Sequence, residues 1–263
     1  MYRLVVFDMD GVLFLGETVI PAAPRAVERL KRKKVAIRYL TNNSTQTREF
    51  YVGKLAGFGI IAEPDEIVTS ASATANYIAR HTSLKTVFVV GGPGLRDEMI
   101  QMGIAVITPE LPLTQDLVCD GVVAGLDKNF TYETLLRAQQ IILRTGVLIA
   151  TNRDTQYPTE TGVIPGGGSI VAAIAAAAEV EPLTIGKPEP TGLQFLMDSV
   201  GVDTSHTLMV GDRLDTDIAC ANRAGADSAC VLTGVTSALQ CASAAGACKP
   251  TFVIVTLDEL MAD

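Results

Sequence analysis

Short apolar runs alternate along the chain with segments in which apolar residues recur every three to four positions. Runs rich in β-branched residues are typical of strands, and the longer period is typical of amphipathic helices. The pattern predicts ten strands, at residues 4–8, 35–40, 66–70, 86–90, 121–125, 147–151, 182–186, 207–211, 228–232 and 252–255. Strands that alternate with helices of about 10 to 15 residues indicate βαβ units around a largely parallel sheet. The predicted fold class is therefore α/β with a largely parallel sheet.

Ten strands are at the upper limit of about ten that one twisted open sheet accommodates. Two sheets in two domains are therefore the more economical arrangement. No linker rich in proline, serine or charge marks a boundary between them. The alanine-rich segment 170–180 predicts a well-packed helix. The basic run 31–34 closes another helix, where it complements the negative end of the helix dipole.

The composition is that of a globular protein, with 263 residues of which 48% are hydrophobic and 19% charged. A chain of this length buries about 70 to 75% of its unfolded surface, enough for one large domain or two of ordinary size. The net charge of -8 argues against a nucleic-acid partner, because binding a phosphate backbone needs a basic surface. No apolar run approaches the length of a membrane span, so we expect no membrane partner.

The cysteines are odd in number and include no Cys-x-x-Cys pair; they are Cys119, Cys220, Cys230, Cys241 and Cys248. This usage predicts neither a zinc site nor a disulfide framework, and it fits a reducing cytosol. The first residues run directly into a strand without the pattern of a secretory leader. We therefore expect a soluble, cytoplasmic protein.

The first predicted strand ends on two carboxylates. Val5, Val6 and Phe7 read as a strand buried on both faces, and Asp8 and Asp10 follow them. In an extended chain these two side chains point to the same side, about 6 to 7 Å apart. Two negative charges at that distance repel by roughly 2.5 kcal/mol at an effective dielectric constant of about 20. A cation, a proton or solvent must compensate this cost, so the pattern indicates chemistry rather than stability.

Polar residues also follow three other predicted strands. In open parallel sheets ligands bind at the carboxyl ends of the strands. Beyond Asp8 and Asp10, the residues in such places are Thr41, Asn42, Asn43 and Ser44 after strand 35–40, Lys187 after strand 182–186, and Asp212, Asp215 and Asp217 after strand 207–211. If the four strands lie side by side, these side chains converge on one edge of the sheet.

The combined set predicts phosphoryl-transfer chemistry. Grouped carboxylates form a site for a hard cation, and Mg²⁺ prefers one or two carboxylates together with waters and a substrate phosphate. Such an ion would keep Asp8 ionised and ready to act as a nucleophile. Asp10 can protonate the leaving oxygen and later accept a proton from water, provided that its pKa is raised. The polar groups of Thr41, Asn42 and Lys187 would hold and neutralise the phosphoryl oxygens.

Each segment taken alone also has a purely structural interpretation. Asp8 and Asp10 can serve as turn or cap residues. Residues 41–44 can cap a helix that begins near Thr45, and Lys187 can be an ordinary surface lysine. The acids at 212–217 can mark the start of a helix, where negative charge is favourable. The four segments in order favour the chemical interpretation.

The four segments DMDGV, LTNNS, GKP and VGDRLDTDI, in this order, resemble the signature motifs of the haloacid dehalogenase superfamily of aspartate-nucleophile phosphatases, and the resemblance covers the whole chain. It implies that Asp8 is the nucleophile that forms an aspartyl-phosphate and that Asp10 is the general acid and base. It also implies that Mg²⁺ binds Asp8, the backbone carbonyl oxygen of Asp10 and Asp212, while Asp217 supports the site from behind. The residues expected to bind the phosphoryl group are Thr41, Asn42, Asn43 and Lys187, the last of which bridges it to Asp8.

The spacing of the motifs predicts where an additional domain lies. Only 31 positions separate Asp10 from Thr41, whereas 144 separate Asn43 from Lys187. In this superfamily an insertion between the second and third motifs is a class II cap. The segment LGETVIPAAPRAVERL together with TNNST resembles the class IIA branch, which includes NagD-like, 4-nitrophenyl phosphate, phosphoglycolate and pyridoxal phosphate phosphatases. The resemblance implies an α/β cap at residues 82–183, inserted into a Rossmann-like parallel-sheet catalytic core formed by residues 1–81 and 184–263.

One cap segment resembles the substrate-specificity loop of that branch. It is TNRDTQYPTETGVIPGGGS at residues 151–169, and its candidate substrate contacts are Asn152, Arg153, Asp154 and Tyr157. Animal pyridoxal phosphatases have histidine where Tyr157 falls, which argues against pyridoxal phosphate as the substrate. The alternative is an ordinary glycine-rich turn that enters a helix at 168–179. The branch also suggests a homodimer formed through the cap.

The expected function is Mg²⁺-dependent hydrolysis of a small phosphomonoester. Phosphoglycolate, a nucleotide and a sugar phosphate all remain open as substrates. One alternative is phosphotransfer to another acceptor, as in mutases of the same superfamily, and another is a phosphorylated receiver domain. A different class is an NAD(P)-dependent oxidoreductase, since GGPGLR at 91–96 follows a strand and opens a helix. That match is weak, because Asp97 stands where the third glycine of the dinucleotide motif belongs.

Overall fold

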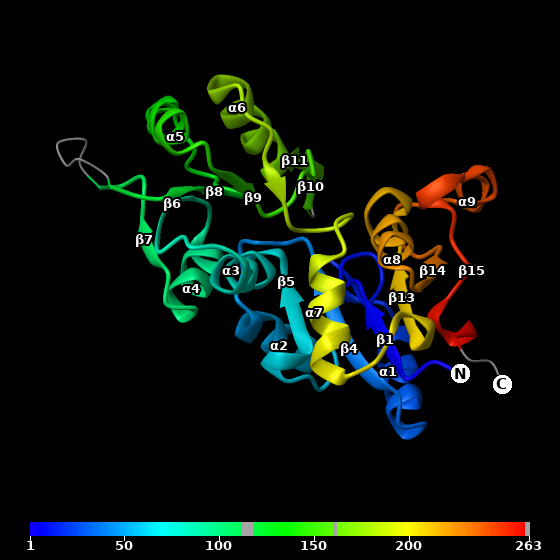
Figure 1. The fold of residues 1–263 in the computed structure, drawn as a ribbon. Coiled ribbons are helices and arrows are strands. Elements are labelled where there is room, and N and C mark those ends of the chain that lie inside the picture. The colour runs from blue at the N-terminus through cyan, green and yellow to red at the C-terminus, as the bar shows by residue number, and fades with distance from the viewer. Residues whose placement is uncertain (112–117, 160–161, 261–263) are drawn as a thin grey trace. The chain divides into compact units, whose positions relative to one another are not determined.

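The computed structural model describes residues 1–111, 118–159 and 162–260 (Figure 1). Contacts between residues divide the chain into two compact units. The first unit comprises residues 1–41, 48–68 and 187–263, and the second comprises residues 42–47 and 69–186. The chain therefore leaves the first unit twice and returns to it twice. Within the described ranges, no helix has both the length and the apolar character needed to cross a membrane.

The first unit is built on a six-stranded sheet in the order β15-β14-β13-β1-β4-β5. Its strands are β1 (Leu4–Phe7), β4 (Ala36–Thr41), β5 (Ile67–Thr69), β13 (Thr207–Gly211), β14 (Asp227–Val231) and β15 (Phe252–Ile254). β1 pairs in parallel with β13 on one side and with β4 on the other. All four residues of β1 are buried, as expected for a central strand of a parallel sheet.

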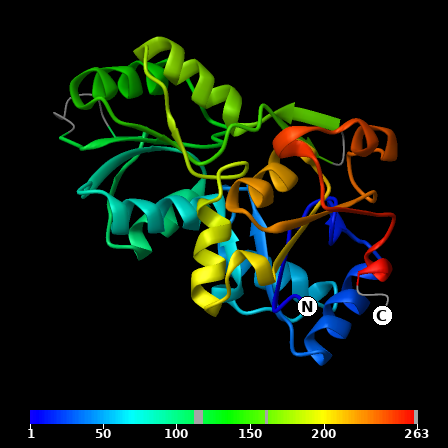
Figure 2. The same cartoon turned by 45° about the vertical axis from the view of Figure 1, so that its right-hand side comes forward.

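Helices cover both faces of this sheet. They are α1 (Ala22–Arg32), α2 (Arg48–Gly57), α7 (Thr191–Val200), α8 (Ala219–Ala224) and α9 (Ala238–Ser243). Val5 and Phe7 of β1 belong to the core cluster that includes α1 and α2, whereas Leu4 and Val6 belong to the cluster that includes α7 and α8. Figure 1 shows α7 in front of the strands, and Figure 2 shows the same elements in a turned view. The alternation of side chains along β1 therefore supplies both hydrophobic cores.

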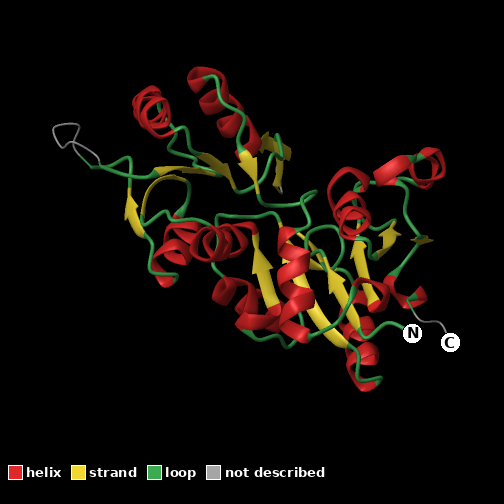
Figure 3. Cartoon of the chain, in the orientation of Figure 1, coloured by secondary structure: helices red, strands yellow, loops and turns green. Residues whose placement is uncertain are grey.

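The second unit contains a parallel five-stranded sheet in the order β12-β9-β8-β6-β7. Its strands are β6 (Thr86–Val90), β7 (Ala105–Ile107), β8 (Gly121–Ala124), β9 (Leu148–Ala150) and β12 (Leu183–Thr184). The helices of the unit are α3 (Ser70–His81), α4 (Pro93–Gln101), α5 (Tyr132–Thr145) and α6 (Gly167–Ala178). Apolar residues of α5 and α6 form one core with β6, β8 and β9, and α3 packs against α4. Figure 3 shows helices beside the strands of both sheets.

Short elements complete the described part of the chain. Two hairpins are formed by β2 (Phe14–Leu15) with β3 (Thr18–Val19) and by β10 (Gln156–Thr159) with β11 (Gly162–Pro165). The short helical turns are η1 (Pro64–Glu66), η2 (Thr204–His206), η3 (Leu214–Ile218), η4 (Gly246–Cys248) and η5 (Leu257–Glu259). Of these, η3 is a π-helical turn that leads directly into α8. Such turns are frequent at functional sites.

The predicted α/β class with two sheets is confirmed, as are the helix at 170–180 and the helix that ends in a basic run at Arg32. One expectation was wrong. The strand predicted at 182–186 is only Leu183–Thr184, and it pairs with β9 in the second sheet rather than with the strands that carry the other motifs. A strand of two residues, of which only Leu183 is apolar, cannot specify which sheet it joins, because register is set by the hydrophobic pattern of a longer segment.

The sequence patterns missed β7, the β10–β11 hairpin and the two-residue strands β2 and β3. β7 is an edge strand of only three residues, Ala105–Ile107, and so short an apolar run shows no period that separates a strand from other structure. The hairpin contains Pro158 and Gly162, residue types that lower the expectation of a strand. Contacts also place α3 with the second unit. The cap boundaries at 82 and 183, which were derived from motif spacing, stay a prediction.

Candidate active site

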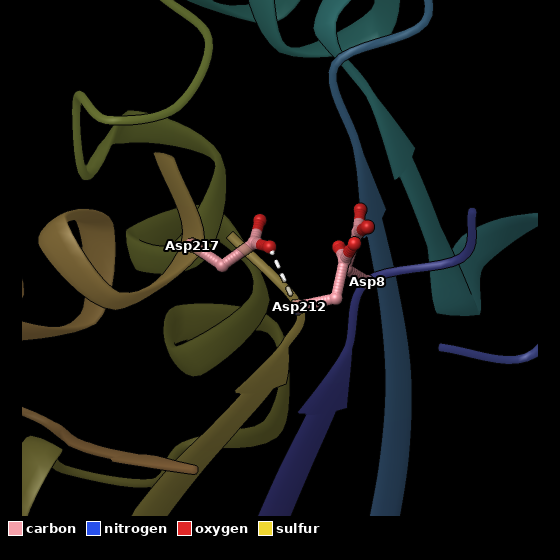
Figure 4. Close-up of side chains that lie close together, drawn as sticks. All are labelled: Asp8, Asp212 and Asp217. Carbon is pink, nitrogen blue, oxygen red and sulfur yellow. Dashed lines mark hydrogen bonds between the residues drawn. The ribbon is translucent and has the colours of Figure 1, made fainter. Parts of the chain in front are cut away.

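Three carboxylates gather at one end of the central strands of the first unit. Asp8 follows β1, Asp212 follows β13, and Asp217 lies in η3. One oxygen of each lies within 4.8 Å of the others, and all three residues are buried (Figure 4). β1 and β13 are adjacent and parallel, with Phe7 paired with Val210, so the residues that follow them emerge side by side. The arrangement can hold a cation through oxygen ligands.

Lys187 reaches into this cluster. Its Nζ lies 2.5 Å from Asp8 Oδ1 and 2.7 Å from Asp217 Oδ1, and it donates a hydrogen bond of 3.2 Å to the Leu40 carbonyl oxygen on β4. Burial by itself lowers the pKa of Lys187, but the charges of Asp217 and Asp8 outweigh this effect and hold the pKa above its usual range. The ammonium is therefore charged at neutral pH. Lys187 thus lies beside Asp8 and Asp217, although β12, the strand that precedes it, belongs to the five-stranded sheet of the second unit.

The cluster carries excess negative charge, since three carboxylates face one ammonium among these four residues. Burial raises the pKa of Asp8 well above its usual range, and the charges of Asp217 and Asp212 add to the shift although Lys187 opposes it. Burial and the charge of Asp217 likewise raise the pKa of Asp212 to about 7. Ionisation is costly because the charges are close together and shielded from water. A divalent cation would remove that cost, so these residues fit Mg²⁺.

Asp217 is held by the backbone of its own turn. Its Oδ2 accepts hydrogen bonds from the backbone N–H groups of Asp212, at 3.1 Å, and Arg213, at 3.0 Å. Figure 4 shows the first of these bonds, with the Asp217 carboxylate directed toward those of Asp8 and Asp212. A β-carbon added at Gly211 would lie 2.1 Å from the Asp217 β-carbon, so the glycine is needed for this approach. Asp217 therefore links η3, β13 and Lys187.

Asp10 occupies a different environment from Asp8. The strand ends at Phe7, before both carboxylates, and Gly11, with φ of +81°, turns the chain after Asp10. That the two side chains point to the same side stays a prediction. Asp10 is half-buried. Burial raises the pKa of Asp10, and the charge of Glu17 adds to the shift, while the charges of Lys54 and Lys187 oppose it. A raised pKa is the property that a general acid requires near neutral pH.

The residues expected to bind the phosphoryl group lie in both units. Thr41 is the buried last residue of β4 in the first unit. In the second unit, Asn42 Nδ2 donates to Asp154 Oδ2 and Asn43 Nδ2 donates to the Tyr157 hydroxyl, each at 3.0 Å. The amides of Asn42 and Asn43 are thus oriented by two residues that the sequence suggested as substrate contacts.

The backbone of Asn42 is also held in place. Its carbonyl oxygen accepts bonds from Asn152 Nδ2, at 2.7 Å, and from Ser70 Oγ, at 2.6 Å. Ser70 begins α3, and no pattern in the sequence pointed to it. The fourth predicted contact, Arg153, forms an exposed ion pair with Glu181 at 2.6 Å. Asn152, Asp154 and Tyr157 therefore all bond to Asn42 or Asn43 of the second motif. Arg153 instead pairs with Glu181.

The glycine-rich segment after β6 is used for packing. The Gly94 N–H donates a 3.2 Å bond to the Thr45 carbonyl oxygen, and a β-carbon on Gly94 would lie 2.6 Å from the Gln46 backbone. The glycine thus allows α4 to approach the chain after the second motif. In a dinucleotide site, such a glycine lets the backbone approach the pyrophosphate of the cofactor. Here the space next to Gly94 is filled by the backbone of Gln46, which does not favour the oxidoreductase alternative.

Comparisons with known proteins identify the family of this chain. The haloacid dehalogenase-like hydrolase family model matches residues 5–105, and an HAD-hydrolase-like model matches residues 184–260. The chain is 39% identical over 236 residues to the acid sugar phosphatase of Staphylococcus haemolyticus, which covers 90% of this chain and 87% of that protein.

Two solved structures extend the similarity to the whole fold. The 4-nitrophenylphosphatase of Thermotoga maritima is 35% identical, with a TM-score of 0.89 and coverage of 98% of this chain and 96% of its own. The glycerol phosphate phosphatase of Mycobacterium tuberculosis, solved in complex with calcium, is 31% identical, with a TM-score of 0.88 and coverage of 97% and 74%. The chain therefore belongs to the haloacid dehalogenase-like hydrolases and is a phosphatase of their class IIA branch.

Proposed function

We propose that this phosphatase is a Mg²⁺-dependent phosphomonoester hydrolase that works through an aspartyl-phosphate on Asp8. The observation that carries the proposal is the position of the buried Asp8 carboxylate, 2.5 Å from Lys187 Nζ and within 4.8 Å of oxygens from Asp212 and Asp217. A carboxylate held in this way is oriented by fixed charges rather than by mobile water. That is the requirement for an aspartate nucleophile.

The reaction has two steps. An oxygen of Asp8 attacks phosphorus and displaces the substrate alcohol, and Asp10 gives its proton to the leaving oxygen. Asp10 then accepts a proton from a water molecule that attacks phosphorus, which releases inorganic phosphate and restores the Asp8 carboxylate. The raised pKa of Asp10 supports its role in both proton transfers. Lys187 and the polar groups of Thr41, Asn42 and Asn43 would neutralise and orient the phosphoryl oxygens.

The candidate metal ligands are the carboxylates of Asp8 and Asp212 and the carbonyl oxygen of Asp10. When bound, Mg²⁺ supplies positive charge that screens the phosphoryl oxygens from the surrounding carboxylates. Asp217 is engaged by two backbone N–H groups and by Lys187. We therefore assign it the role of fixing Lys187 and the start of η3 rather than that of a direct ligand.

The first substrate class to test is small sugar and polyol phosphates. The relatives described above are named for acid sugar phosphatase and glycerol phosphate phosphatase activities. The test is a screen of phosphorylated metabolites that measures released phosphate with Mg²⁺ present and then chelated. If the phosphoryl group passes to an added alcohol instead of water, the enzyme is a phosphotransferase. A cytoplasmic location and a homodimer formed through residues 82–183 stay predictions.

Removal of divalent metal is expected to abolish turnover without unfolding the protein. Protein treated with EDTA should release no phosphate above background, and added Mg²⁺ should restore the rate. At a Mg²⁺ concentration of about 100 times its dissociation constant, the free energy of unfolding should increase by about 2.7 kcal/mol. Asp212→Asn should lose most of this increase because it removes a candidate ligand. Full activity of metal-free protein would contradict the proposed metal dependence.

Loss of the Asp154 carboxylate is expected to weaken substrate binding. The Asp154→Ala variant removes the 3.0 Å bond from Asn42 Nδ2, so the orientation of the amide toward a phosphoryl oxygen is weakened. A hydrogen bond to a charged group contributes about 1.5 kcal/mol or more, which corresponds to roughly a tenfold increase in KM. The matched control is Asp154→Asn, which keeps a carbonyl acceptor and should raise KM less. Equal KM values for the alanine variant and the wild type would refute this role.

A further inference from the structure

The loop after β14 lies against the metal-binding residues of the first unit. β14 is the neighbour of β13 in the sheet, with Cys230 paired with Gly211. The loop continues through Thr233, Gly234 and Val235. Val235 is 68% exposed, so burial of its side chain does not hold the loop in place. Hydrogen bonds and close contacts of the loop with the first unit explain its position.

Two of these contacts hold the Asp212 carboxylate. The Val235 N–H donates a hydrogen bond of 2.9 Å to Asp212 Oδ2. A β-carbon on Gly234 would lie 1.9 Å from the same oxygen and 2.4 Å from Asp212 Cγ. Gly234 has no left-handed backbone conformation, so the close approach, rather than the φ angle, requires a glycine here.

A third contact ties the loop to the turn after β1. Thr233 Oγ1 donates a 2.7 Å bond to the Gly11 carbonyl oxygen, across 222 positions of sequence. Gly11 itself packs on Asp212, because a β-carbon there would lie 2.4 Å from Oδ2. Asp212 is thus enclosed between two glycine backbones that Thr233 joins together. Rotation of the buried carboxylate is restricted on both sides.

We infer that Thr233, Gly234 and Val235 position Asp212 for the divalent cation, Gly234 by making room for the carboxylate, Val235 by fixing Oδ2, and Thr233 by joining the loop to Gly11. Because Oδ2 is held by the loop, the geometry favours metal ligation through Oδ1. Groups that orient a metal ligand typically change metal affinity by about 10- to 100-fold when they are lost. The inference rests on the proposed Mg²⁺ dependence.

The first test is Gly234→Ala. Mg²⁺ is titrated by calorimetry into metal-free protein, after circular dichroism has established that the variant is folded. The added methyl group displaces the Asp212 carboxylate, so the dissociation constant for Mg²⁺ should rise about tenfold or more. Gly53→Ala is the matched control: Gly53 lies in α2 of the same unit, and an added β-carbon there meets nothing within 4 Å. Its Mg²⁺ affinity should equal that of the wild type.

The second test compares Thr233→Val with Thr233→Ser. Valine keeps the size of the side chain but cannot donate to the Gly11 carbonyl oxygen, whereas serine can. The valine variant should need several-fold more Mg²⁺ for half-maximal activity, and it should regain the wild-type kcat at saturating Mg²⁺ with substrate KM unchanged. Serine should restore the wild-type Mg²⁺ dependence. A merely structural role would lower the melting temperature without moving the Mg²⁺ dependence.

The outcomes separate this inference from the proposed function. If the wild type itself does not bind Mg²⁺, the proposed metal dependence fails and the inference fails with it. If the wild type binds Mg²⁺ and both Gly234→Ala and Thr233→Val bind it equally well, only the inference is overturned. If Gly234→Ala does not fold, the threonine pair decides, because valine and serine differ at this site in the donated hydrogen bond.

Discussion

Replacing Asp8 by Asn is expected to reduce turnover by about 10⁴-fold or more, because the proposed nucleophile is lost while the shape of the side chain is kept. An amide cannot form the acyl phosphate, and none of the remaining motif residues stands in the same place. The fold should survive, since the variant removes one negative charge from a cluster that has an excess of them. The measurements are phosphate release at saturating Mg²⁺ and acid-quenched detection of phosphorylated protein, which should be absent in the variant.

Asp258→Asn is the matched control for this experiment. Asp258 belongs to the same unit and forms an exposed ion pair with Arg25 at 2.8 Å. Surface pairs of this kind contribute about 0 to 1 kcal/mol, so the control should keep both its activity and its stability. Substantial turnover by folded Asp8→Asn would falsify the assignment of the nucleophile, even if the metal dependence held.

Replacing Lys187 by Met is expected to impair both activity and stability. Lys187 is 4% exposed and lies between Asp8 and Asp217. Removing one partner from a buried charge cluster typically costs about 3 to 5 kcal/mol, because the remaining charges are left uncompensated. The phosphoryl group also loses a cation that neutralises it during transfer, and we expect kcat/KM to fall by about 10³-fold. Steady-state kinetics and urea unfolding in EDTA measure the two effects separately.

The loss of stability in Lys187→Met should depend on pH. The pKa of Asp8 is raised even with the lysine present, and that of Asp212 is raised to about 7. A carboxyl group whose pKa is higher in the folded state than in the unfolded chain holds a proton that unfolding releases. Its ionisation therefore lowers the free energy of unfolding as the pH rises from about 4 through the raised value.

The deficit of the variant should accordingly be small near pH 4 and largest above pH 7. The surface change Lys31→Met should leave stability within about 0.5 kcal/mol of the wild type at every pH. A deficit of Lys187→Met that does not change with pH would show that the carboxylates are not the groups left uncompensated.

Part of the site follows from local sequence. The buried run of β1 and its neighbour β13 were recognisable from apolar residues alone, and parallel strands present their carboxyl ends at one edge. That geometry is sufficient to expect Asp8 and Asp212 together. Lys187 was expected in the same place for a reason that proved wrong, since β12 lies in the second sheet. Lys187 still reaches Asp8, although only Ile185 and Gly186 separate it from the end of β12.

The environment of each group could not be predicted in this way. Strand alternation was the reason to expect Asp8 and Asp10 on one face, but β1 already ends at Phe7, so neither residue belongs to the strand. Ser70 and the Thr233–Val235 loop carry no local signal of a role. Ser70 and Thr233 bond to the backbone carbonyl oxygens of Asn42 and Gly11. The Val235 N–H bonds to the Asp212 carboxylate. Only the fold brings these partners together.

The sequence by itself determined the α/β class, the strands that carry Asp8 and Asp212, and the order of the four motifs, because these depend on local hydrophobic period and on which residues end a strand. Only the tertiary structure decided which sheet receives β12, how Asp154 and Tyr157 orient the asparagines of the second motif, and which glycines enclose Asp212. Those features depend on contacts between segments distant along the chain, whose geometry is set by packing of the whole domain and not by the residues nearby.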